Sequence, residues 1–248
     1  MTRLKLLCVL IGLSAGSAAH AGNFQVSPVR AVLDAKTRST LLTLSNRGAA
    51  PLRVQIDAYR WDETSAGSPV LDPTDQVVVF PSLLELAVGE VRTIRVGTTE
   101  PGDALERTYR IIIEEQPSSD KQAAGIAIRM RVSVPVFVGG AGSAVPRLEA
   151  PTVDAQGRLH ASVVNDGARH FKPLSLIAVV TDGHGAATTV KIAGWYVLAH
   201  HRRDYVLALP VAATCVRTIT LQLDADQGLI EKSYPIVDTR CSVPATRG

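Results

Sequence analysis

The sequence predicts an all-β protein, and three observations lead to that class. Val, Ile and Thr recur in short runs separated by Gly, Pro, Asn and Asp, which is typical of strands joined by turns. Few stretches have the period of a helix. The chain of 248 residues divides into two halves of roughly 100 residues with the same strand rhythm, and this is the usual size of an immunoglobulin-like sandwich. We therefore predict two immunoglobulin-like β-sandwich domains.

Residues 1–21 have the pattern of a cleavable secretory signal peptide. Arg3 and Lys5 form a basic start, LLCVLIGL at 6–13 is the apolar segment, and Ala-His-Ala at 19–21 is a small-x-small cleavage site. The alternative is a membrane anchor, but the apolar run is shorter than the roughly 20 residues that a bilayer requires. We expect export of the mature chain, and no later segment is expected to span a membrane.

Export changes what the charge and the cysteines mean. Removing Arg3 and Lys5 lowers the formal net charge from +3 to +1, which provides no overall field to attract nucleic acid. Cys215 and Cys241 are the two cysteines that remain, and one disulfide between them is the simplest expectation in an oxidising compartment. A redox or metal pair is disfavoured because there is no Cys-x-x-Cys and no matching histidine spacing.

The first predicted domain covers residues 22–140. Turn signals such as Asn46-Arg47-Gly48 separate its strands. The strands are predicted, in order, at 24–33, 39–46, 52–61, 76–80, 83–86, 91–97, 108–115 and 126–138.

A break is predicted at 139–146, where GGAGSAVP interrupts the strand pattern, and the second domain is predicted over 146–248. Its strands are predicted at 159–165, 175–181, 194–198, 204–209, 218–223 and 231–237. Large aromatic residues are expected to pack in or cap the cores, Trp61, Tyr59 and Tyr109 in the first and Trp195 and Tyr196 in the second.

The strand predicted at 126–138 alternates strictly. One face carries Ile126, Ile128, Met130, Val132 and Val134, and the other carries Ala127, Arg129, Arg131 and Ser133. Two arginines in the middle of a sheet are hard to bury, so we predict that this strand lies at a sheet edge. Such a strand can pair with another protein. The alternative is that the apolar row faces the core of its own domain.

Five separated motifs resemble one family. They are PVRAVLD at 28–34, LTLSNRG at 42–48, VVVFPSLLELAVGEVRTIRV at 77–96, YRIIIEEQP at 109–117 and IAIRMRVSVPVF at 126–137. In order and spacing they resemble the periplasmic chaperones of the chaperone-usher pathway of pilus assembly, which are PapD-like. The last two motifs are most similar to the archaic branch, which serves spore-coat-like pilin subunits. The resemblance covers most of 24–138 and is much weaker over 146–245.

The resemblance implies an L-shaped or boomerang arrangement of the two sandwiches and a periplasmic, non-enzymatic function without a cofactor. The implied partners are a pilus subunit (pilin), whose sandwich is incomplete, and an outer-membrane usher. Ile126, Ile128, Met130 and Val132 would enter the groove of the subunit while backbone hydrogen bonds complete its sheet, which is donor-strand complementation. Whether the free chaperone self-associates through the same edge stays open.

The resemblance also implies an anchor for the terminal carboxylate of the subunit. In the classical branch of the family, an arginine of the first strand and a lysine of the last first-domain strand clamp this group. Arg30 matches the arginine, but the lysine position falls on Ser133. Arg110 and Arg131 are the candidates to replace the lost charge, because a guanidinium grips a carboxylate through two parallel hydrogen bonds. The alternative for each arginine is a solvated face or an internal ion pair with Glu114, Glu115 or Asp57. The family further suggests that Glu114 or Glu115 helps to set the angle between the domains.

Other classes of function find less support. The sequence has no Gly-x-Ser-x-Gly, no His-Glu-x-x-His and no phosphate-binding glycine loop, and its histidines lack ligand spacing, so neither an enzyme nor a metal site is expected. A secreted two-sandwich module that binds or adheres through its loops remains an alternative. That module would tolerate changes at 126–134 and be sensitive at its loop tips, and the chaperone would show the reverse.

Overall fold

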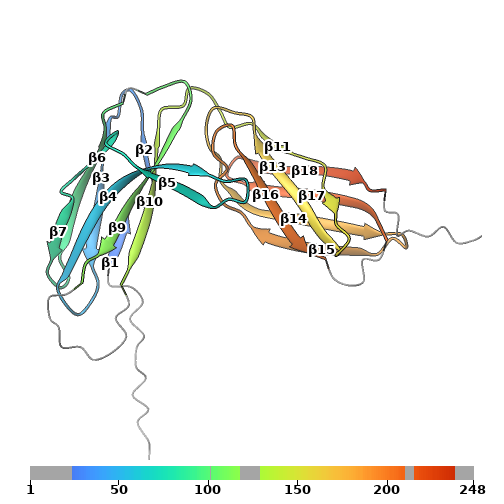
Figure 1. Cartoon of the computed structure of the whole chain (residues 1–248), viewed down its shortest axis with the longest axis horizontal. Coiled ribbons are helices and arrows are strands. Elements are labelled where there is room, and N and C mark those ends of the chain that lie inside the picture. The colour runs from blue at the N-terminus through green and yellow to red at the C-terminus, as the bar shows by residue number, and fades with distance from the viewer. Residues whose placement is uncertain (1–23, 101, 118–128, 210–214, 238–248) are drawn as a thin grey trace, which may run out of the picture.

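The computed structural model describes residues 24–100, 102–117, 129–209 and 215–237. All regular elements in these residues are strands, and two β-sandwich lobes meet at an angle (Figure 1). The predicted all-β class with two sandwich domains is therefore confirmed. No helix in the described ranges is long and apolar enough to cross a membrane.

The first sandwich consists of two sheets. One sheet has the strand order β1 (Phe24–Ser27), β3 (Ser39–Asn46), β8 (Val91–Thr98) and β6 (Val77–Phe80). The other has the order β2 (Ala31–Leu33), β10 (Arg131–Val138), β9 (Arg107–Glu115), β4 (Leu52–Glu63) and β5 (Pro69–Pro73), and β7 (Leu83–Leu86) also pairs with β4. Alternate residues of these strands meet in one core, which includes Leu42, Leu44, Ile94, Tyr109, Ile111 and Val134.

The second sandwich also consists of two sheets. In one sheet β13 (Arg158–Asn165) lies between β11 (Pro146–Leu148) and β12 (Thr152–Val153), and it also pairs with β16 (Arg202–Ala208). The other has the order β15 (Ala187–Ala193), β14 (Pro173–Asp182), β17 (Val216–Ala225) and β18 (Gly228–Pro235). Their shared core includes Leu159, Val163, Leu176, Leu221 and Leu223. Each lobe thus buries an apolar core of its own.

The strand predicted at 24–33 is two strands in different sheets. β1 pairs with β3, whereas β2 runs parallel to β10. The chain changes sheets at Pro28, which has no backbone N–H to donate to a ladder, and the Ser27–Pro28 peptide bond is cis. Arg30 therefore lies on the exposed segment that connects β1 to β2.

Other strand predictions also differ from the structure. β11 and β12 were not expected, and the strand predicted from residue 126 begins at Arg131 in the described residues. β5 was not expected because Pro69, Asp72 and Pro73 are turn formers, yet it pairs with the end of β4 in an exposed hairpin. The strand predicted at 194–198 is wrong, because this segment forms only a single bridge, between Val197 and Phe171. The strand in that region, β15, ends at residue 193.

A third apolar cluster lies where the two lobes meet. It contains Trp61 and Phe137 from the first lobe and Tyr196 and Leu198 from the second. Trp61 and Tyr196 therefore pack against each other between the lobes and in neither core, whereas Tyr109 lies in the first core, as expected. Alternation explains the difference, because Trp61 and Phe137 lie on the outer face of their sheet, opposite the core face.

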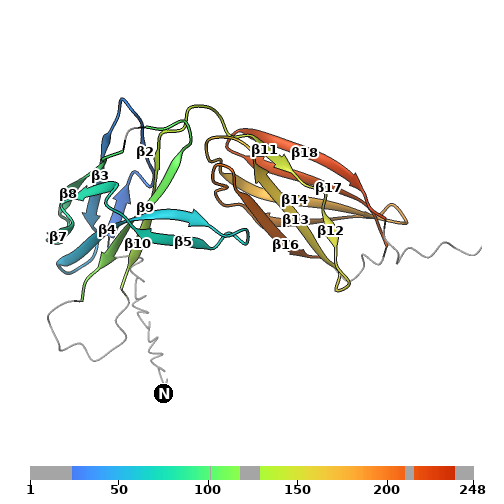
Figure 2. The same ribbon diagram turned by 45° about the horizontal axis from the view of Figure 1, so that its top comes forward.

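The hairpin of β4 and β5 reaches from the first lobe to the second, as two views show (Figures 1 and 2). At its tip, the N–H of Asp204 donates to the carbonyl oxygen of Ser65 at 2.7 Å. The Arg203 side chain lies against Gly67, where an added Cβ would be 2.2 Å from the guanidinium carbon. Residues 139–145 connect β10 to β11 as the second link between the lobes.

Several predictions fall outside the described residues. The signal peptide, Ile126, Ile128 and Cys241 are among them, so the Cys215–Cys241 disulfide stays a prediction.

Candidate functional site

The strand β10 presents a partly open edge. β9 pairs with β10 along the whole of Arg131–Val138, but on the other side β2 pairs only with residues 136–138. Within the ranges that the structure describes, residues 131–135 have no strand partner on that side. The predicted edge strand is thus present over the first part of β10.

Backbone groups point out of this open edge. The N–H of Glu115 donates to the carbonyl of Met130 at 3.0 Å, so the even-numbered residues of β10 direct their backbone groups to β9. In an antiparallel ladder the alternate residues direct theirs to the opposite side. The outward groups are therefore the N–H and C=O of Arg131 and Ser133 and the C=O of Pro135, which form a template for an added strand.

The burial of the apolar row in and just before β10 decreases toward its N-terminal end. Val134 is only 1% exposed and belongs to that core. Val132 and Met130 are partly buried and pack against its margin. The alternative that the row faces its own core thus applies fully to Val134, whereas Met130 and Val132 keep exposed surface.

Arg110 lies beside the vacant lysine position. Because Ile111 and its alternates face the core, Arg110 lies on the outer face of β9, diagonally across from Ser133. Its Nη1 donates to the Ser133 hydroxyl at 3.0 Å, and its guanidinium carbon lies 3.8 Å from the centroid of the Trp61 ring. Burial lowers the pKa of Arg110, and the nearby Glu63 opposes that shift. A guanidinium remains charged at any physiological pH, so a fixed positive charge lies beside Ser133.

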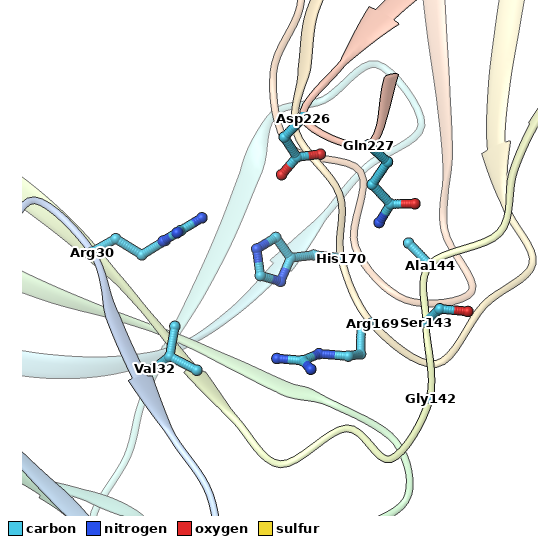
Figure 3. A pocket seen from close by; sticks show the side chains of 9 residues that line it. All are labelled: Arg30, Val32, Gly142, Ser143, Ala144, Arg169, His170, Asp226 and Gln227. Atoms are coloured by element: carbon cyan, nitrogen blue, oxygen red, sulfur yellow. The ribbon is translucent and has the colours of Figure 1, made fainter. Parts of the chain in front are cut away.

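Arg30 lines a pocket of about 330 Å³ between the two lobes. The side chains of Arg30 and Arg169 enter this pocket from opposite sides (Figure 3). The pocket is lined by Arg30, Val32, Gly142, Ser143, Ala144, Arg169, His170, Asp226 and Gln227. The lining contains three basic side-chain types and one carboxylate. Two of the basic side chains, Arg169 and His170, also lie 3.6 and 2.6 Å from the carboxylate of Glu106.

Tyr196 connects the two candidate arginines. Burial raises the pKa of its hydroxyl, and the positive charges of Arg30 and Arg110 both oppose that shift. The charges of Arg30, on the segment before β2, and of Arg110, on β9, therefore both act on the Tyr196 hydroxyl. Their role as an anchor stays a prediction.

Arg131 lies apart from this pair. Its Nε is 3.6 Å from a carboxylate oxygen of Glu114, and both side chains are largely exposed. This is the internal ion pair that the sequence left open for it. Glu115 accepts a hydrogen bond from the N–H of Met130 through its side chain at 3.2 Å, so both glutamates make contacts within the first lobe.

The carboxylates that reach the second lobe are ones that sequence reasoning missed. The buried Glu106 accepts from the backbone N–H of His170 at 2.7 Å and lies 2.6 Å from its Nδ1. The His170 ring in turn stacks on Phe137, with centroids 3.4 Å apart. We expected Glu114 or Glu115 to set the domain angle. The carboxylate contacts with the second lobe come instead from Glu106 and from the end of β4. The sequence offered no signal for Glu106, which is a single acidic residue in a loop.

The end of β4 supplies two further interdomain ion pairs. Asp62 lies 2.6 Å from Nε2 of His201, and Glu63 lies 3.3 Å from Nη1 of Arg203. Burial raises the pKa of Glu63 from its ordinary value of 4.5 to about 7, while Arg203 and Arg110 oppose the shift. These contacts and the aromatic cluster join the two lobes.

Comparisons with known proteins agree with this geometry. Residues 23–142 match the family described as pili and flagellar-assembly chaperone, PapD N-terminal domain. Among curated proteins, none matches the chain in sequence.

Solved structures resemble the chain over both lobes. One is from the CsuC–CsuE chaperone–tip adhesion subunit pre-assembly complex of archaic chaperone-usher Csu pili of Acinetobacter baumannii, with 19% identity, 85% of this chain and 98% of that chain covered and a TM-score of 0.62. Another is the class 5 fimbriae chaperone CfaA, with 12% identity, 87% and 100% coverage and a TM-score of 0.55. A third is from the Salmonella enterica SafA pilin in complex with the SafB chaperone, with 17% identity, 88% and 99% coverage and a TM-score of 0.54.

The fold is thus that of the two-domain β-sandwich pilus chaperones. With the match over residues 23–142, the first lobe belongs to the PapD N-terminal domain family of pilus-assembly chaperones.

Proposed function

We propose that this protein is a periplasmic, non-enzymatic chaperone that binds pilus subunits by donor-strand complementation and delivers them to an outer-membrane usher. The observation that carries this proposal is the open edge of β10 at residues 131–135 beside the paired arginines Arg30 and Arg110. The donor residues are Ile126, Ile128, Met130 and Val132, as the resemblance implied.

The energetics suit transient binding. Burying four such apolar side chains contributes roughly 6–12 kcal/mol in gross terms, since each is worth about 1.5–3 kcal/mol, and ordering costs cancel much of this. Release then requires no nucleotide, because a better-fitting strand can replace the donated one. The solved complexes named above contain pilus or tip subunits, which supports a subunit as the partner class.

The proposed anchor consists of Arg30 and Arg110, which would bind the terminal carboxylate of the subunit from the first lobe. Arg110 replaces the charge that Ser133 lacks, and its hydrogen bond to the Ser133 hydroxyl supports this assignment. Arg131 is not part of the proposed anchor, because Glu114 already neutralises it at the other end of the open edge.

Co-expression with a pilus subunit tests the proposal. We expect a stoichiometric complex with the wild type and none with the Ile126→Asp, Ile128→Asp double variant, because each aspartate would bring an unpaired charge into the apolar groove. Leu41→Asp is the matched control, since Leu41 is an exposed apolar residue of β3, on the other sheet. A complex that survives in the folded double variant would show that subunits bind elsewhere.

A further inference from the structure

We propose that Trp195 of the second lobe is a positioning residue for the carboxylate anchor, because it closes over the guanidinium of Arg110. The anchor would then be completed by both domains, although both of its arginines belong to the first. This inference rests on the proposed function, since it concerns the same anchor.

The chain contains two tryptophans, and both contact Arg110. The guanidinium carbon lies 3.8 Å from the ring centroid of Trp61 and 5.8 Å from that of Trp195. Both distances are within the range in which the negative face of an indole attracts a cation. Trp61 comes from the same sheet as Arg110, whereas Trp195 comes from the other domain.

Few hydrogen bonds hold the Arg110 head group. Its Nη1 donates to Ser133, but its buried Nε has no hydrogen-bond partner among the described residues. A guanidinium with an unpaired buried N–H keeps its orientation through ring contacts instead. Removing one of the two rings should therefore loosen the fork that binds a carboxylate.

Trp195 is held in place from its own domain. The N–H of Gly194 donates to the carbonyl of Leu174 at 2.9 Å. An added Cβ on Gly194 would lie 2.3 Å from the carbonyl oxygen of Pro173, so this close approach requires glycine. On the other side, the Trp195 ring packs edge-on against Tyr196, with centroids 5.5 Å apart.

The segment that follows Trp195 is fixed by a buried asparagine. Nδ2 of Asn165 donates to the carbonyls of Val197 at 3.2 Å and Leu198 at 2.9 Å. Val197 also exchanges two backbone hydrogen bonds with Phe171, at 3.0 and 3.2 Å. The backbone around Trp195 is thus fixed to the second sandwich. Trp195 is nevertheless 42% exposed and belongs to neither core. The core of its own domain therefore leaves the Trp195 ring free to contact the first lobe.

The experiment compares two probe peptides on the full-length mature chain. Both are labelled peptides of alternating valine and threonine, one with a free terminal carboxylate and the other with a terminal amide. The ratio of their affinities, measured by fluorescence anisotropy, reports the anchor alone, because both peptides use the open edge equally. We expect the wild type to prefer the carboxylate, and Trp195→Ala to reduce that preference by about two- to fivefold, the size of an exposed cation–π contact.

Two variants separate positioning from folding. Trp195→Phe keeps an aromatic face and should retain most of the preference, and in the Arg110→Met background Trp195→Ala should have no further effect. Val206→Ala is the matched control, since Val206 is a similarly exposed apolar residue of the second lobe that lies outside the aromatic cluster.

The possible failures are distinguishable. If the wild type bound neither peptide or bound both equally, the proposed edge or anchor would be wrong and the inference with it. If the wild type preferred the carboxylate and Trp195→Ala did so to the same extent, the proposed function would stand and the positioning role of Trp195 would be overturned.

Discussion

The two sandwiches place a buried asparagine at the same point of the fold and use it differently. Asn46 ends β3 and Asn165 ends β13, and neither is exposed. In both, the side-chain oxygen accepts from the N–H of the glycine two residues later, Gly48 or Gly167. In both, Nδ2 also donates to the carbonyl four residues later. The two domains therefore share one local device.

The difference lies in what else each asparagine binds. Nδ2 of Asn46 donates to Leu86 and Ala87, at the end of β7 in its own domain. Nδ2 of Asn165 donates to Val197 and Leu198, in the segment that carries Trp195 and Tyr196 into the cleft. The same local motif thus closes a sandwich in one domain and supports the domain interface in the other.

The largest expected effect comes from removing these two asparagines. Asn46→Ala and Asn165→Ala should each lower the free energy of unfolding by about 3 kcal/mol, because each leaves several buried carbonyls without a donor. Thermal unfolding followed by circular dichroism measures this. Asn165→Ala should also shift the tryptophan emission of the folded protein, since both tryptophans lie in the cleft, and Asn46→Ala should not. Equal emission shifts in the two variants would contradict the different roles assigned to Asn46 and Asn165.

The next effect concerns the contact between the domains at Glu63. Because burial raises its pKa to about 7 in the folded chain, its contribution to stability is fully present below its ordinary pKa of 4.5 and is lost as the pH rises through 7. Relative to Glu63→Gln, the wild type should therefore lose on the order of 2 kcal/mol between pH 4.5 and 8. Denaturant unfolding of both proteins across this range measures the change. A difference that stays constant with pH would contradict the raised pKa.

A smaller effect is expected where the first domain lacks the family lysine. Ser133→Lys should be less stable than Ser133→Ala by about 1 kcal/mol, because it places a second positive charge next to Arg110. The denaturant midpoint measures this difference. In the Arg110→Met background the penalty should vanish, and a penalty that persists would mean that Arg110 does not occupy the place of the lysine.

The smallest effect is expected at the far end of the same strand. Arg131→Ala removes an exposed ion pair with Glu114, and such pairs contribute at most about 1 kcal/mol and often nothing. We expect a change in unfolding free energy of less than about 0.5 kcal/mol and unchanged capture of subunits. Loss of capture, measured by co-purification, would show that Arg131 contributes to subunit binding and belongs to the anchor.

The sequence was most informative where one local pattern repeats. Strict alternation predicted most of the strands and the apolar row of the last first-domain strand, because strand periodicity is a local property. It failed at β5, whose prolines and aspartate are turn formers, and at 194–198, where apolar residues face the other domain rather than a ladder. The shared Asn-x-Gly at 46–48 and 165–167 was present in the sequence and would have indicated the repeated corner.

The candidate site was predicted only in part. Arg30 and Arg110 were named from motif positions, and their positive charges both act against the raised pKa of Tyr196, while their role as an anchor stays a prediction. Trp195 and Glu106 were not found, because no spacing in the sequence relates them to residues of the other domain. Their role depends on contacts between segments that are far apart along the chain.

By itself, the sequence determined the all-β class, the two sandwiches and the resemblance to pilus chaperones, because alternation, turn residues and family motifs are all local. The tertiary structure alone decided that β2 covers only part of β10, which leaves an open edge. It also decided which carboxylates bridge the domains and that both tryptophans meet at Arg110. These features arise from the packing of one domain against another, which no local pattern encodes.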